Sequence, residues 1–109
     1  MATRKQKSID ALVEAFDSQM FRALAEPGRV EILKFLLAHG RSDIQTVAAA
    51  VGKDRSVISR HMHTLSDAGL LRSEKVSRNV FFEIDSESFV RKTRALFDQV
   101  SRAIDACCS

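Results

Sequence analysis

Hydrophobic positions recur at helical spacing along most of the chain. Residues 9–24 keep their apolar side chains on one stripe, whereas residues 30–38 are apolar on more than one side. Pro27 is placed to start the second of these helices, and Gly40 is placed to end it. The first stripe predicts a helix with one buried face, and the second predicts a helix packed between neighbouring elements.

Two further helices follow, joined by a very short connection. Ser42 and Gln45 form an S-x-x-Q capping box for a third helix, which Gly52 ends. Asp54 is placed to cap a fourth helix directly afterwards. Two helices joined by a short turn that contains glycine are typical of a helix-turn-helix. We therefore expect a helix-turn-helix over residues 42–68.

After this unit the pattern changes from helical to alternating. Residues 70–84 contain two short runs of strand-forming residues on either side of residues 77–79, which predicts a β-hairpin. A last helix with one apolar stripe follows over residues 86–106. The element order α-α-α-α-β-β-α predicts a mainly α fold with a small β-hairpin (α+β), a winged helix-turn-helix that occupies residues 1–109 as a single domain.

Charge changes this picture in one segment. The chain has 109 residues, of which 45% are hydrophobic and 28% charged, as in an ordinary globular domain. Residues 53–80 carry six Lys and Arg against three Asp and Glu, a surplus equal to the net charge of +3 of the whole chain. A local basic surface suits a polyanion such as nucleic acid, and the alternative is an ordinary solvated face.

The fourth predicted helix has a core side and a polar side. Ile58, Met62 and Leu65 share one face at helical spacing, so we expect them to be buried. Arg60 lies opposite and is the strongest candidate for a base or phosphate contact in the major groove. The residues that we predict to contact DNA, from this helix and from the tip of the hairpin, are Arg55, Ser56, Val57, Ser59, Arg60, His63, Lys75 and Arg78.

The first and last helices have more apolar surface than the central unit needs as a cover. We expect residues 9–24 and 86–106 to be dimerisation helices of a homodimer, and the alternative is that both stripes close the core of one protomer. Residues 1–8 are expected to form a flexible basic arm, and residues 70–84 the wing.

Several sequence features that are absent limit the compartment and the chemistry that we expect. No apolar run approaches the about 20 residues that a membrane span needs, and no secretory signal is evident. Cys107 and Cys108 are adjacent, and neighbouring cysteines rarely pair with each other, so a reducing cytoplasm is favoured over a disulfide scaffold. No catalytic motif and no glycine-rich phosphate loop are present, so we do not expect an enzyme.

Three segments read FRALAEPGRVEILKFL (21–36), RSVISRHMHTLSDAGLL (55–71) and VSRNVFFEID (76–85). Together they resemble the ArsR/SmtB family of bacterial winged-helix repressors. The resemblance implies a homodimer that binds an inverted-repeat operator in double-stranded DNA and leaves it when an inducer binds. The chain departs from the family pattern in its wing, where Ser77 and Arg78 replace the usual glycine. It also lacks the Cys-x-Cys pair and the Asp/His series of the best-known metal sensors, so no metal is expected at those sites.

Cys107 and Cys108 are the candidate inducer site. Neighbouring thiolates suit soft, thiophilic species, and a methylated or aryl trivalent arsenical needs only two sulfur ligands. Such an arsenical is therefore the candidate inducer, no cofactor is required, and disulfide or persulfide chemistry between subunits is a second use of the thiols. The alternatives are a frayed terminus without a role, a repressor without a small-molecule inducer, and a winged-helix module for protein docking or dimerisation.

Overall fold

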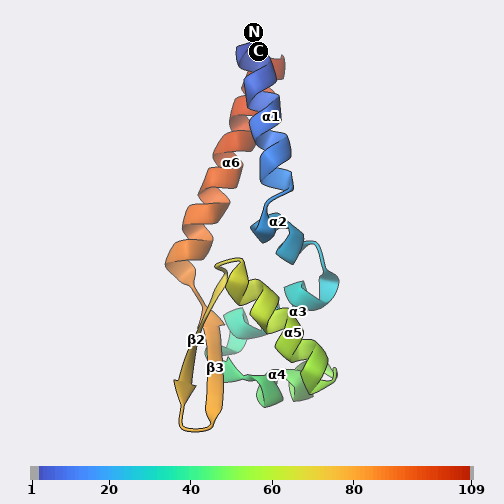
Figure 1. Cartoon of the computed structure of the whole chain (residues 1–109), viewed down its shortest axis with the longest axis vertical. Coiled ribbons are helices and arrows are strands. Elements are labelled where there is room, and N and C mark those ends of the chain that lie inside the picture. Colours follow the sequence, from blue (N-terminus) through green and yellow to red (C-terminus); the bar gives the residue numbers. More distant parts are fainter. Residues whose placement is uncertain (1–2, 109) are drawn as a thin grey trace.

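The computed structural model describes residues 3–108 and divides into a two-helix stalk and a body (Figure 1). The body holds the remaining helices and one small sheet, and the molecule extends over 55 × 23 × 23 Å. In chain order the elements are α1 (Arg4–Phe16), α2 (Gln19–Leu24), α3 (Pro27–His39), β1 (Ser42–Asp43), α4 (Ile44–Val51), α5 (Arg55–Asp67), β2 (Leu71–Val76), β3 (Asn79–Ile84) and α6 (Ser86–Cys108). The predicted winged helix-turn-helix fold is confirmed, but the element order differs by one additional helix, α2, and one short strand, β1.

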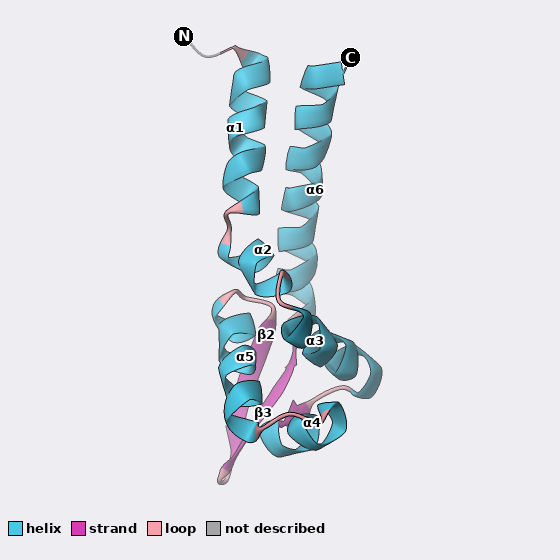
Figure 2. Ribbon diagram, turned by 90° about the vertical axis from the view of Figure 1, so that its right-hand side faces the viewer, coloured by secondary structure: helices cyan, strands magenta, loops and turns pink. Residues whose placement is uncertain are grey.

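The stalk consists of α1 and α6, which run antiparallel and bring both chain ends to the far end of the molecule (Figures 1 and 2). The first predicted helix is interrupted at Ser18. The Ser18 Oγ accepts a hydrogen bond from the Phe21 N–H at 3.2 Å, and this bond caps the start of a separate helix, α2. The prediction of one continuous helix over residues 9–24 was therefore wrong, because the chain forms two helices, α1 and α2, over this range.

The predicted arm at residues 1–8 is also corrected. Residues 4–8 form the first turns of α1, since the Thr3 Oγ1 accepts a hydrogen bond from the Gln6 N–H at 3.1 Å and caps the helix. Residues 1 and 2 of that arm lie outside the described residues. Within the described range, none of the helices is long and apolar enough to cross a membrane.

The core of the body lies between α3, α4, α5 and one face of the sheet. The helix α3 is buried on one side, where its Ile32, Leu33 and Leu36 are at most 5% exposed. The prediction that it is packed on more than one side was wrong for this chain, because Val30 and Leu37, which lie away from that side, are 45% and 71% exposed. The largest fully buried side chains in the described chain are Phe82, Ile32, Leu36, Ile58, Met62, Leu65, Leu70 and Val47. Burial of these apolar groups is the main stabilising contribution to the body.

The start of α4 differs from the prediction by one residue. Asp43 caps it by accepting a hydrogen bond from the Thr46 N–H at 2.8 Å, and hydrogen bonding from Thr46 lowers the pKa of Asp43 below its usual value. Ser42, the predicted cap, instead lies in β1, where it pairs with Phe82 of the strand β3. Its hydroxyl donates a hydrogen bond to the Gly40 carbonyl at 3.0 Å. Sheet pairing thus takes Ser42 out of the helix start.

The sheet has the order β1-β3-β2, and both pairs are antiparallel. The two long strands form the predicted hairpin, which closes with the two-residue turn Ser77–Arg78. Ser77 has φ +58°, a value that favours glycine and is typical of the first central residue of mirror-image hairpin turns. The chain then enters α6 at Ser86, where the predicted last helix starts, and Asp85 caps the helix by accepting a hydrogen bond from the Ser88 N–H at 3.2 Å.

Candidate DNA-binding surface

The helix α5 has one buried and one exposed side, as predicted. Ile58, Met62 and Leu65 are at most 1% exposed and pack into the core. Ser56 and Arg60 lie on the opposite side, and both are exposed. The turn of three residues between α4 and α5 contains Gly52, whose φ of +71° ends α4. This arrangement supports α5 from behind and leaves its polar side open.

The other residues predicted on α5 fall into two groups. Arg55 is exposed at the start of the helix, and Ser59 is half-buried. His63 is exposed at its surface, but it donates from Nδ1 to the Ser59 carbonyl at 2.7 Å and lies edge-on to the buried Phe82 ring. Val57 is half-buried and lines a groove between α5 and α3, so it lies apart from the exposed polar side.

The hairpin extends to the end of the molecule opposite the stalk (Figure 1). Lys75 lies near the end of β2, and Arg78 lies in the turn; both side chains are exposed. A cation at this tip can contact a phosphate beside the groove that α5 would occupy, which is the positioning role that a wing has.

Most basic residues of the segment 53–80 form no ion pair with the described residues. Arg72 is the exception, because its Nε donates to Glu83 at 2.9 Å across the hairpin, and this hydrogen bond raises the pKa of Arg72. The basic residues of this segment without an ion pair among the described residues are Lys53, Arg55, Arg60, Lys75 and Arg78. The predicted positive surplus is therefore accessible to phosphates.

Lys92 of α6 holds the end of α5, which the sequence analysis did not predict. The helix ends with two backbone hydrogen bonds of a Schellman motif, from Leu70 to Leu65 at 3.0 Å and from Gly69 to Ser66 at 2.9 Å. The Lys92 Nζ donates to the Ala68 carbonyl at 2.9 Å, where a cation also suits the helix dipole. The stalk is thereby tied directly to α5.

Arg29 ties α2 and α3 to the other side of α5. Its Nε donates to the Ala23 carbonyl at 2.7 Å, and its Nη1 lies 3.5 Å from the His61 Nδ1. His61 is half-buried at the edge of the core. Burial lowers the pKa of His61 below its usual value, and the charge of Arg29 lowers it further. Both Arg29 and Lys92 act over long sequence separations that no local pattern signals.

Cys107 and Cys108 lie at the end of α6, far from α5 and the wing (Figure 2). Both thiols are exposed. Hydrogen bonding with the Cys107 thiol raises the pKa of Cys108, whereas the charge of Lys5 on α1 acts in the opposite direction. In residues 3–108 no group of three or more His, Cys, Asp or Glu side chains is placed to hold a metal ion. Within the described residues of one chain, the two thiols are therefore not joined by a third His, Cys, Asp or Glu side chain.

Comparison with known proteins finds similar transcriptional regulators. A protein-family model described as HVO_A0114 matches residues 24–88. The chain is 30% identical over 69 residues to the HTH-type transcriptional regulator KmtR of Mycobacterium tuberculosis, in a match that covers 63% of this chain and 52% of KmtR. The chain thus spans about half the length of this relative.

Solved structures share the fold. A possible transcriptional regulator for arsenical resistance superposes with a TM-score of 0.65 and 31% identity, over 76% of this chain and 83% of that chain. A homodimeric winged helix-turn-helix DNA-binding domain from Mycobacterium bovis, a possible ArsR-family regulator, gives a TM-score of 0.63 and 26% identity, over 92% and 87% of the two chains.

KmtR is a transcriptional regulator and the two solved structures are of possible transcriptional regulators, in agreement with the expectation that the chain is not an enzyme. The helix order, the buried side of α5 and the hairpin all match the resemblance found in the sequence. The chain belongs to the ArsR/SmtB family of winged helix-turn-helix transcriptional regulators.

Proposed function

We propose that this chain is a homodimeric transcriptional repressor that binds an inverted-repeat operator in double-stranded DNA and is released by a thiol-reactive inducer. The observation that carries the DNA-binding part is the two-sided α5, with Ile58, Met62 and Leu65 in the core and Ser56 and Arg60 exposed opposite them. A helix supported in this way can enter the major groove with its polar side toward the bases.

Within this proposal the contacts divide into two kinds. Arg60 pairs with a guanine edge or a phosphate, and Ser56 and Ser59 contact base edges or the backbone. Lys75 and Arg78 neutralise phosphates from the wing, which fixes the register of the protein without reading sequence. Their free charge in the described chain supports this assignment.

The stalk is the proposed dimer interface. Val13 on α1 and Phe97 on α6 are 61% and 68% exposed, a large solvent contact for apolar side chains. Val90, Phe97 and Ile104 are all exposed and recur every seven residues, so they form one apolar seam along α6. A second copy of the chain would cover this seam, and the homodimeric relative supports that assembly. The two recognition helices of such a dimer would meet half-sites about one DNA turn apart.

The inducer of this proposal is a trivalent organic arsenical held by Cys107 and Cys108. The two thiols belong to neighbouring residues at the end of α6 and both are exposed, so they can offer two sulfur ligands to one arsenic atom. Each thiol proton leaves with one arsenic-bound hydroxide as water, so two As–S bonds replace two As–O bonds without oxidation or reduction. The arsenical-resistance regulator among the solved structures supports this inducer class.

The direct test is a fluorescence anisotropy titration of the reduced protein onto its own upstream DNA and onto a scrambled duplex. The proposal predicts tighter binding to the upstream DNA, with affinity that falls steeply as salt increases, because phosphate neutralisation releases counterions. No binding to either duplex would contradict the proposal and favour a winged-helix module that docks to protein.

The inducer part has a separate test on the preformed complex. Methylarsenite should release the wild-type protein, while the double variant Cys107→Ser/Cys108→Ser should bind DNA equally well and stay bound. Equal release of both proteins would refute the thiol site. Binding that no thiol-reactive compound relieves would leave a repressor without this inducer.

A further inference from the structure

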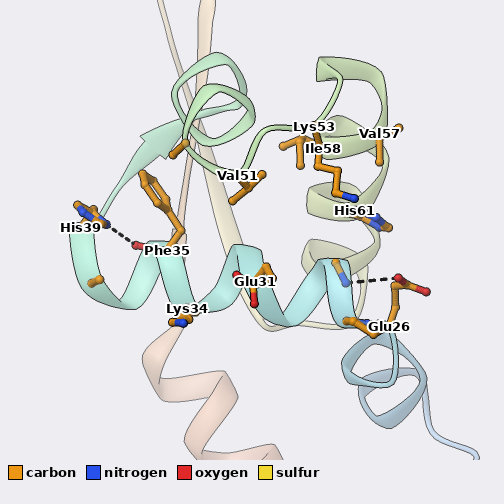
Figure 3. Close-up of a pocket in the computed structure, with 14 residues that line it drawn as sticks. Glu26, Glu31, Lys34, Phe35, His39, Val51, Lys53, Val57, Ile58 and His61 are labelled. Carbon is orange, nitrogen blue, oxygen red and sulfur yellow. Dashed lines mark hydrogen bonds between the residues drawn. The ribbon is translucent and has the colours of Figure 1, made fainter.

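A groove of about 620 Å³ separates α3 from the α4–α5 turn and the first half of α5 (Figure 3). This volume lies within the roughly 300–1,000 Å³ of small-molecule sites. Its apolar lining includes Phe35 on α3, Val51 at the end of α4, and Val57 and Ile58 on α5. The groove lies in the body and is separate from the thiol pair at the end of the stalk.

One end of the groove is a flat wall. The Phe35 ring and the His39 imidazole stack with centroids 4.4 Å apart and planes inclined by 20°. The His39 Nδ1 also donates to the Phe35 carbonyl at 3.2 Å, which fixes the imidazole beside the ring (Figure 3). Planar rings pack favourably against such a surface in offset or edge-on arrangements. The wall therefore suits a planar, aromatic ligand.

The charged lining residues favour an anionic group of that ligand on the α4–α5 side of the groove. Lys34 of α3 and Lys53 of the α4–α5 turn both line it, and neither forms an ion pair with a residue of the described chain. Glu26, at the start of α3, accepts a hydrogen bond from the Gly28 N–H at 3.3 Å. Both lining carboxylates, Glu26 and Glu31, belong to the α3 side of the groove, so Lys53 is the one charged lining residue of the described chain on the α4–α5 side.

We propose that this groove binds a small planar aromatic carboxylate, with its ring on the apolar lining and its carboxylate on Lys53. Lys53 directly precedes the cap of α5 and belongs to the basic segment 53–80. A carboxylate on Lys53 neutralises one cation of that segment, so the ligand weakens DNA binding, and DNA weakens ligand binding by the same factor. This second step rests on the proposed DNA-binding function.

Ligand binding is tested first without DNA, by following amide shifts of ¹⁵N-labelled protein. The probes are 2-naphthoate, its neutral amide 2-naphthamide and the cationic 2-naphthylmethylamine. We expect 2-naphthoate to shift amides of α3 and of residues 51–58 and to bind at least fivefold more tightly than the other two. Equal affinity for the three probes, a preference for the amine, or no binding at millimolar concentration would overturn the proposal.

Two variants locate the site. Lys53→Gln should remove the preference for the acid over the amide, whereas Lys7→Gln on the stalk should retain it. Ala38→Trp places a large side chain at the exposed lip of the groove and should weaken all binding without disturbing the core. Unchanged 2-naphthoate affinity in both Lys53→Gln and Ala38→Trp would place the ligand elsewhere and refute the assignment.

The DNA arm separates this inference from the proposed function. In the anisotropy titration 2-naphthoate should weaken DNA binding of the wild type at least threefold and leave Ala38→Trp unaffected. Binding of 2-naphthoate with no effect on DNA affinity would refute the antagonism. Failure of the ligand-free protein to bind DNA would refute the proposed function, while the ligand titration would still decide the groove.

Discussion

Gly69 is the position where a single methyl group should do the most damage in the body. It has φ +79°, and a Cβ built on it would lie 2.8 Å from the Lys92 Nζ and 2.9 Å from the Lys92 Cε. Gly69→Ala therefore combines a backbone penalty with the loss of the hydrogen bond from Lys92 to Ala68. Gly52 is the matched control, because its φ is +71° and nothing lies within 4 Å of its Cβ position.

The two contributions can be estimated separately. A left-handed backbone costs a residue other than glycine about 1–2 kcal/mol. A hydrogen bond to a charged group contributes about 1.5–3 kcal/mol, and we take the lower value because Lys92 is only half-buried. We therefore expect Gly69→Ala to reduce the free energy of unfolding by about 3 kcal/mol, against about 1–2 kcal/mol for Gly52→Ala.

The assay is urea unfolding followed by far-ultraviolet circular dichroism at one fixed protein concentration, because dimerisation makes stability depend on concentration. A double-mutant cycle isolates the clash. In a Lys92→Ala background the Nζ and Cε are gone and the Ser88 Oγ, 3.1 Å from the built Cβ, is the nearest remaining atom, so Gly69→Ala should cost less than it does in the wild type.

Two results would refute this reasoning. The first is an equal cost for Gly69→Ala and Gly52→Ala in the wild-type background. The second is a cost of Gly69→Ala that does not change when Lys92 is replaced. Either result would mean that Lys92 moves aside freely and does not hold the end of α5.

Three further predictions follow from single residues. Ser77→Gly should raise the free energy of unfolding by about 1 kcal/mol in the same urea assay, because it relieves a φ of +58°; no gain would mean that the turn is unstrained. His61 has a pKa lowered below 6.5, so the unfolded chain binds its proton more readily; stability should be full above pH 6.5 and fall as the pH decreases through the folded pKa. His61→Gln should reduce that loss between pH 7.5 and 5.5, and an unchanged pH dependence of the urea midpoint would contradict it. Phe97→Glu should weaken the dimer at least tenfold in sedimentation equilibrium, because it places a charge in the exposed seam of α6, whereas Arg91→Glu would serve as a control outside the seam; equal dissociation constants for the two variants would argue against the stalk interface.

Local pattern predicted most of the fold because its signals lie close together in the chain. The spacing of Ile58, Met62 and Leu65 identified the buried side of α5, and Pro27 and Gly52 marked helix ends through their own backbone preferences. These residues need no distant partner to act as they do, so a sequence pattern is sufficient to find them.

The predictions were wrong or incomplete where a distant contact or a competing local signal determined the structure. Ser42 and Asp43 are both acceptable caps, and the pairing of β1 with β3 selects Asp43. Ser18 lies within a stripe whose helical spacing continues across it, so the break between α1 and α2 was not signalled. The bond between Lys92 and Ala68 joins residues 24 positions apart, which no periodicity can predict.

The candidate site was predictable only in part for the same reason. Helical spacing separated the exposed Arg60 from the core. It could not show that the half-buried Val57 lines a groove against α3, because that groove depends on the tertiary fold. The DNA contacts of Arg55, Ser56, Arg60 and the wing stay predictions until they are measured on DNA.

The most direct test of the central claim compares Arg60→Ala with Arg91→Ala, an exposed arginine on the stalk, on upstream DNA and on a scrambled duplex. If α5 enters the major groove, Arg60→Ala should lose about 1–3 kcal/mol, or roughly 5- to 150-fold, of affinity for the upstream DNA, and Arg91→Ala should bind as the wild type does. Normal operator binding by Arg60→Ala, or equal losses in both variants, would show that this side of α5 does not read DNA.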